Sequence, residues 1–156
     1  MDNKYIKFYN NLVILTRNKN LYMHFTSEDT FSDRLIILLF HFAFFLNVFK
    51  SKNNKEVQEI FDYFFKQIEF DLREAGLGDV SINKKMKNYV NIFYSIIRKI
   101  DKWDNSSSNE QSKIFIDYLN IDENSLKLVE YFDNYRIYLL NNTFNSLIKG
   151  VIKLKF

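Results

Sequence analysis

Few side chains in this sequence could carry out catalysis, and their spacing does not favour it. The chain has no Cys and only two His, His24 and His41. A nucleophilic triad requires Ser or Cys within reach of a His and an acid, and a metal centre requires several ligands close together. His24 has no second ligand nearby, while His41 lies in an apolar segment and is expected to be a hydrogen-bonded core histidine. The acids Glu28 and Asp29 fall in a polar loop, where solvation and helix capping explain them. We predict no enzyme activity, no metal and no cofactor.

The motif with catalytic associations is Gly76-Leu77-Gly78-Asp79. Intramembrane aspartyl proteases carry a Gly-x-Gly-Asp string whose Asp shares a proton with a second membrane-embedded carboxylate. That mechanism requires several spanning helices, which this sequence does not predict. A phosphate loop is also excluded, because the string follows a predicted helix and lacks the Gly-Lys-Ser/Thr ending.

The same string is typical of a turn between two helices. Gly76 suits the left-handed conformation that often follows a helix end. We expect Gly78 to allow a second unusual backbone angle and Asp79 to hydrogen-bond the freed amides. Ser81 is the expected cap of the next helix.

Composition favours a single helical domain. The chain of 156 residues contains no Pro and only three Gly, but 17 Phe and 10 Tyr. Long helices with a core rich in large aromatic side chains are therefore expected. The absence of Cys excludes disulfides and is consistent with a reducing compartment. A net charge of +3 is too small to indicate nucleic-acid binding by itself.

Apolar residues recur at helical spacing along most of the chain. This predicts an all-α fold, a single compact domain over 1–156 with about six mostly antiparallel helices. The last predicted helix should carry Ile137, Leu140, Phe144, Leu147 and Val151 along one seam, and the closing "VIKLKF" is expected to be a tail. The predicted helices cover 4–18, a segment from a cap at Thr30 or Ser32 to about Lys50, 55–75, a segment from Ser81 to about Ile100, 110–119 and 122–148.

The most apolar run, residues 35–49, is shorter than the roughly 20 residues that cross a bilayer. His41 and Asn47 also interrupt it. We therefore predict a buried central helix. The first 20 residues lack the features of a targeting segment and are expected to belong to the mature protein.

Residues 61–94, "FDYFFKQIEFDLREAGLGDVSINKKMKNYVNIFY", resemble the core signature of the ubiquinol–cytochrome c chaperone family. A weaker match lies upstream, in the order Asp-Thr, Arg and an apolar helix with a central His. Two departures are Asn83, where the family often has Pro, and Ser95-Ile96, where it commonly has Gly-Arg. The matching positions are Phe64-Phe65, Leu72-Arg73-Glu74, the Gly-x-Gly-Asp turn, Lys84-Lys85-Met86 and Phe93-Tyr94, with Asp29, Thr30, Arg34 and His41 upstream.

The resemblance implies a non-catalytic factor that helps newly made cytochrome b mature into ubiquinol–cytochrome c reductase. Mitochondrial members act with a small partner protein near the ribosomal exit, whereas for a bacterial-type chain both contacts are open. The implied location is the bacterial cytoplasm, with a peripheral inner-membrane contact also open, or the matrix side in an organelle. No DNA partner is implied.

The residues themselves suggest where a client could bind. Tyr63 and Phe70 are seven apart and point away from the core stripe of their helix, so they either pack on a neighbouring helix of the domain or form an exposed apolar interface. We predict a groove lined by aromatics and rimmed by lysines. The candidate client-binding residues are Tyr63, Phe70, Arg73, Glu74, Lys84, Lys85, Lys87 and Tyr94.

An alternative uses charge instead. Residues 84–102 contain six cations and one acid, Asp101. Such a patch suits ribosomal RNA, anionic lipid or an acidic partner. The alternative function is therefore an RNA- or ribosome-binding helical module. A third interpretation leaves the turn purely structural and its charges solvated.

Overall fold

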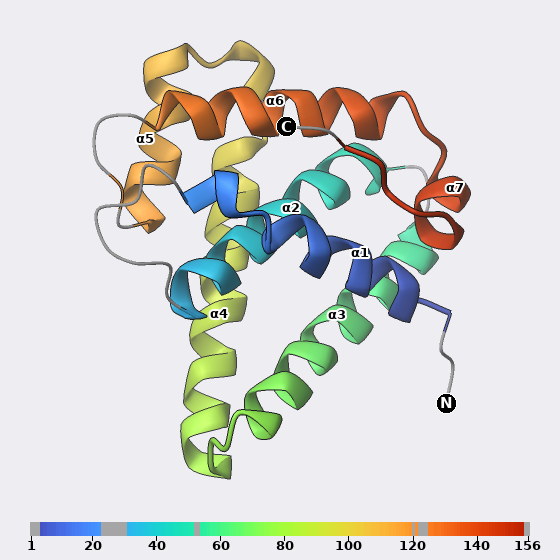
Figure 1. The fold of residues 1–156 in the computed structure, drawn as a ribbon, viewed down its shortest axis with the longest axis vertical. Coiled ribbons are helices and arrows are strands. Elements are labelled where there is room, and N and C mark those ends of the chain that lie inside the picture. The colour runs from blue at the N-terminus through green and yellow to red at the C-terminus, as the bar shows by residue number, and fades with distance from the viewer. Residues whose placement is uncertain (1–3, 23–30, 52–53, 120, 122–124, 155–156) are drawn as a thin grey trace.

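Seven α-helices dominate the part of the chain that the computed structural model describes, residues 4–22, 31–51, 54–119, 121 and 125–154 (Figure 1). The expectations for His24, Glu28, Asp29 and Thr30 fall outside these residues. Two 3₁₀ turns, Lys19–Tyr22 and Trp103–Asn105, join some of the helices. The helices are α1 (Ile6–Thr16), α2 (Phe31–Phe49), α3 (Asn54–Glu74), α4 (Asp79–Ile100), α5 (Ser108–Tyr118), α6 (Leu126–Leu140) and α7 (Phe144–Lys149).

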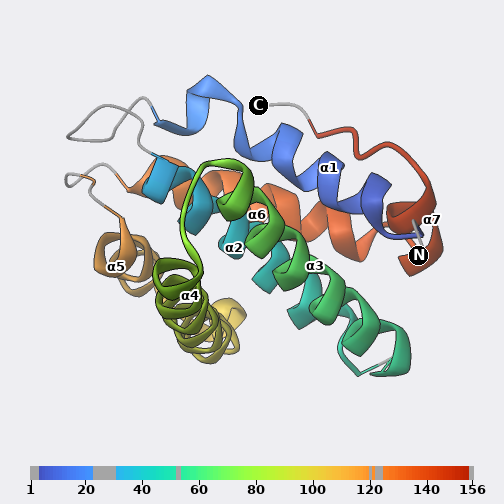
Figure 2. The same cartoon turned by 90° about the horizontal axis from the view of Figure 1, so that it is seen from below.

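Helix α2 is the central element, as the apolar run predicts. It packs against α1, α4 and α6 (Figures 1 and 2). By length and composition alone this helix could cross a membrane, but 72% of its most apolar window is buried inside the fold. Because its surroundings are other helices of the same chain, we interpret α2 as a core helix. Ser32 lies inside α2 and therefore does not cap it.

Phenylalanines on two sides of α2 join it to its neighbours. On one side Phe42 stacks on Phe64 of α3, with 3.9 Å between ring centroids, and on Phe93 of α4 at 5.3 Å. On the other side Phe44 stacks on Phe132 of α6 at 5.2 Å. Residues two apart on a helix point in roughly opposite directions, so α2 contributes rings to both halves of the core.

His41 is the polar centre of this core and is completely buried. Its Nδ1 lies 3.0 Å from the carbonyl oxygen of Ile37 and 3.2 Å from Thr16 Oγ1, and its Nε2 lies 2.6 Å from the hydroxyl of Tyr131. A carbonyl can only accept, so Nδ1 carries the proton and Nε2 accepts from Tyr131. Burial lowers the pKa of His41 to about 3. This is the hydrogen-bonded core histidine that the sequence predicts.

The C-terminal region differs from the prediction of one helix over 122–148. The helix ends at Leu140, and a new helix begins after Thr143, whose Oγ1 accepts a hydrogen bond from the amide of Ser146 at 3.1 Å. The side chain of Asn142 donates to the carbonyl of Tyr138 at 2.7 Å. Side chains of this kind compete for backbone groups and end helices.

The break also makes the predicted seam wrong. Ile137, Leu140 and Val151 are all more than half exposed, whereas Phe144 and Leu147 are buried. Because α7 starts in a new direction, the helical phase is lost between the two groups. Residues 151–154 form no helix or strand, although Ile152 is buried.

Candidate functional site

The turn between α3 and α4 shapes the lower end of the molecule in Figure 1. Gly76 has φ +92°, and the amide of Leu77 donates to the carbonyl of Leu72 at 3.3 Å, which closes the helix end. Gly78 has φ −78° and ψ 163°, an ordinary extended conformation, so the second unusual angle is wrong. Gly78 is the N-cap of α4, and Ser81 is the third residue of the helix and does not cap it.

Charged side chains brace this turn. The guanidinium of Arg73 donates to the carboxylate of Asp79, and its second nitrogen lies 3.2 Å from Glu69. Asp79 thus binds Arg73, where we expected it to bind backbone amides. The Asp79 side chain is 79% exposed and forms an ion pair with the Arg73 guanidinium. This position does not suit a carboxylate that must share a proton with a second acid.

A groove of about 420 Å³ runs beside α3, next to the start of α1. We call it the α1–α3 groove. Phe70 is 55% exposed there, and Tyr63 packs on Tyr5 with 6.1 Å between ring centroids. The groove brings together three of the predicted residues, Tyr63, Phe70 and Arg73. Its full lining is Ile6, Tyr63, Lys66, Gln67, Glu69, Phe70 and Arg73.

The predicted lysines do not line this groove. Lys84, Lys85 and Lys87 are exposed on α4, and the lysine that does line the groove is Lys66. Glu74 is exposed at the end of α3 and is also absent from the lining. Helical spacing correctly predicted which side chains of α3 and α4 point outward. The packing of the two helices places these side chains on different surfaces of the molecule.

Tyr94 belongs to a second groove, of about 380 Å³, between the end of α2, α3 and α4. It is 46% exposed and stacks on Phe61, with 5.9 Å between ring centroids. Phe61 and Tyr63 point to different sides of α3 because they are two residues apart. The predicted client-binding residues are therefore distributed over separate surfaces. The sequence prediction missed Ile6, which lines the α1–α3 groove, and Val57, which lines the second groove. Both residues precede the segment 63–94 that contains the predicted client-binding residues.

Helix α4 and the short turn that follows it carry four exposed cations, Lys84, Lys87, Arg98 and Lys102, which we call the basic stripe. None of them forms an ion pair with another described residue. The acid of this segment, Asp101, pairs with Lys50 of α2 at 3.0 Å. Because Asp101 is already paired with Lys50, it does not neutralise a cation of the stripe, and the stripe keeps its positive charge. Lys99 pairs separately with Asp117 at 3.1 Å.

Comparison with known proteins supports the resemblance in the sequence. The sequence pattern of the family described as ubiquinol–cytochrome C chaperone matches residues 23–113. The chain belongs to this family. The match contains the Gly-x-Gly-Asp turn, the α1–α3 groove residues of α3, and all of the basic stripe. A comparison with curated proteins finds no match.

A solved structure also shares the fold of this chain. The crystal structure of the Cbp3 homolog from Brucella abortus matches with a TM-score of 0.79 at 25% sequence identity. The match covers 98% of this chain and 89% of that one. The shared fold therefore extends to α6 and α7, which lie beyond the residues that the family pattern matches. Membership of a chaperone family favours a binding role over catalysis, and the described residues contain no group of three or more metal-ligating side chains.

Proposed function

We propose that this chain is a non-catalytic assembly chaperone for ubiquinol–cytochrome c reductase, and that its α1–α3 groove binds an apolar segment of newly made cytochrome b. Family membership supports the assembly role. The observation that carries the client site is Phe70, a large apolar side chain that is 55% exposed at the groove. A bacterial relative of known structure supports action in the cytoplasm or at the membrane.

The groove suits an apolar helical segment. Ile6, Tyr63 and Phe70 supply apolar contact, while Lys66 and Arg73 supply a polar rim. An amphipathic or apolar helix placed in such a groove buries its side chains and displaces water. Covering the exposed half of Phe70 contributes about 1 kcal/mol, because full burial of a Phe contributes roughly 1.5–3 kcal/mol. A partner would therefore bind several-fold more weakly without this ring.

The test replaces Phe70→Gln in cells that lack the chromosomal gene. The matched control is Leu126→Gln, a side chain of similar exposure, 53%, which lies at the start of α6 and does not line the α1–α3 groove. We expect wild type and Leu126→Gln to restore haem b absorbance and reductase activity in membranes. Phe70→Gln should restore less, and Phe70→Leu should recover most of the function.

Two results would count against this function. Normal reductase in cells without the gene would show that the chain is not needed for assembly. Full rescue by Phe70→Gln, with equal protein levels, would remove the client from the α1–α3 groove. A photoreactive amino acid at position 70 should cross-link to cytochrome b, whereas the same group at position 126 should not.

A second candidate function, binding of ribosomal RNA, rests on the basic stripe. Its four cations have no ion-pair partner among the described residues. Single-stranded RNA that contacts all four would show a slope of log affinity against log salt of about −3. A three-fold rise in salt would then weaken binding roughly twenty-fold. The double variant Lys84→Gln, Lys87→Gln should halve this slope, and an unchanged slope would exclude the stripe.

A further inference from the structure

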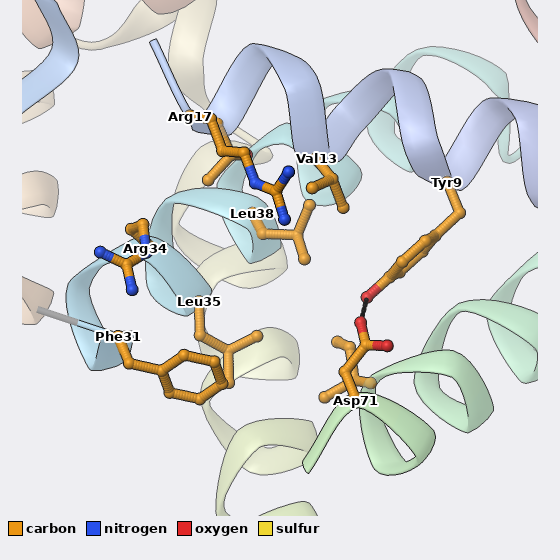
Figure 3. A pocket seen from close by; sticks show the side chains of 10 residues that line it. Tyr9, Val13, Arg17, Phe31, Arg34, Leu35, Leu38 and Asp71 are labelled. Atoms are coloured by element: carbon orange, nitrogen blue, oxygen red, sulfur yellow. Dashed lines mark hydrogen bonds between the residues drawn. The ribbon is translucent and has the colours of Figure 1, made fainter. Parts of the chain in front are cut away.

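A separate cavity of about 120 Å³ lies between α1, the start of α2 and the last turns of α3 (Figure 3). It shares no lining residue with the α1–α3 groove. Its apolar surface comes from three helices. The lining consists of Tyr9, Val13, Thr16, Arg17, Phe31, Arg34, Leu35, Leu38, Ile68 and Asp71.

The two ends of this cavity differ in charge. At one end Tyr9 donates to Asp71 at 2.7 Å, and Gln67 donates to the other oxygen of that carboxylate at 3.5 Å. Arg17 lies at the opposite end in Figure 3, and it forms no ion pair with another described residue. Arg34 lines the same rim but is engaged in another interaction. Both arginines bring positive charge to the cavity, and Arg17 is the one without an ion pair among the described residues.

We propose that this cavity binds the C-terminal residue of a partner polypeptide, with an apolar side chain inside and the terminal carboxylate on Arg17. A cavity of about 150 Å³ can hold benzene, so this one accepts a group of about the size of a Leu side chain. Guanidinium groups bind carboxylates through paired hydrogen bonds. Asp71 repels an anion, which places the carboxylate at the Arg17 end.

The size of the cavity favours a polypeptide end over a larger ligand. In a C-terminal residue the carboxylate and the side chain are attached to the same carbon. One short group can therefore fill the cavity with its side chain and contact Arg17 with its carboxylate. A C-terminal Leu has only about nine non-hydrogen atoms, part of them outside the cavity on Arg17, so such a group alone binds with a dissociation constant of roughly millimolar. The site is thus an anchor that adds to contacts elsewhere. It does not depend on the proposed function, because cytochrome b binding uses other residues.

The experiment titrates the full ¹⁵N-labelled chain with N-acetyl-L-leucine and with its neutral amide, N-acetyl-L-leucinamide, and follows amide shifts by NMR. We expect the acid to shift the amides of Val13 and Leu38 and to bind about ten-fold more tightly than the amide. Arg17→Gln should remove this preference. Lys127→Gln, which removes an exposed positive charge on α6, should keep it. Val13→Phe should fill the cavity and abolish binding of both compounds.

Other outcomes would overturn the proposal. Equal affinity for the acid and the amide, or no shift with either, would exclude a carboxylate site at Arg17. A heptapeptide that ends in Leu with a free carboxylate tells whether the site accepts the end of a polypeptide or only a small free carboxylic acid. It should bind at least as tightly as the free acid, and much weaker binding would exclude a polypeptide end. Reductase assembly in cells that carry Phe70→Gln reports on the other site and leaves this result unaffected.

Discussion

Mild acid should destabilise the fold, because His41 is buried and gains a proton when the chain unfolds. The folded chain holds this side chain neutral, because Nδ1 donates to the carbonyl of Ile37 and Nε2 accepts from Tyr131. Burial lowers its pKa to about 3, whereas an unfolded chain has the ordinary value near 6.5. Between these values the unfolded chain binds a proton that the folded chain does not. Stability contributed by neutral His41 is therefore complete above about pH 6.5 and decreases as the pH falls toward 3.

The size of this effect follows from the distance in pH. Each pH unit below the unfolded pKa lowers the free energy of unfolding by 1.36 kcal/mol. At pH 5 the loss is about 2 kcal/mol, and it depends little on the folded value because pH 5 is well above it. This is a large share of the 5–15 kcal/mol that typically stabilises a domain.

Urea unfolding at pH 7 and pH 5 measures this loss, with the buried Trp103 as a fluorescent reporter. His41→Gln should be less stable than wild type at pH 7, but its stability should fall by about 2 kcal/mol less between the two pH values. Tyr131→Phe is the matched control, because it removes a partner of His41 and keeps the titrating ring. If His41→Gln and wild type lost equal stability between pH 7 and 5, the buried neutral histidine would not be the cause.

Four further substitutions test the turn, a helix cap and the core. Gly76→Ala should lower the free energy of unfolding in urea by about 1–2 kcal/mol, because φ is +92°. Gly78→Ala should change this free energy little, since its backbone is extended and no atom other than those of its chain neighbours lies within 4 Å of the added methyl. Equal losses of stability in the two variants would refute the difference. Ser107→Ala removes a capping box at the start of α5 and should cost about 1 kcal/mol, and unchanged stability would contradict this role. Phe42→Ala should cost about 3–5 kcal/mol and lower the melting temperature strongly; a cost below 1 kcal/mol would show that the ring is not central.

Predictions from local signals were the most accurate. The left-handed site at Gly76 and the polar role of His41 inside an apolar helix both follow from single residues and their neighbours. Local signals failed where two elements compete. Ser81 has a good capping side chain, but α4 begins at Asp79 because Gly78 already provides the extended residue that precedes a helix. Likewise, apolar spacing continues past Leu140, yet the polar Asn-Asn-Thr segment ends the helix there.

The candidate site shows the same division. The spacing of Tyr63 and Phe70 predicts an apolar face on α3, and the structure adds Ile6 from the far end of the chain to form a groove. Lys84 and Tyr94 are close in sequence to this face but lie on other surfaces. A sequence period gives the direction of each side chain around its own helix, but it does not give the neighbour that the helix faces.

By itself the sequence determined an all-α chain, a central apolar helix, a glycine turn and membership of the ubiquinol–cytochrome c chaperone family. These depend on backbone preferences and on residue patterns within one segment. Only the tertiary structure decided which aromatics are buried, which carboxylate Arg73 meets, and where Arg17, Ile68 and Leu38 enclose a cavity. Those features need contacts between residues far apart in the chain, and such contacts are fixed by how whole helices pack.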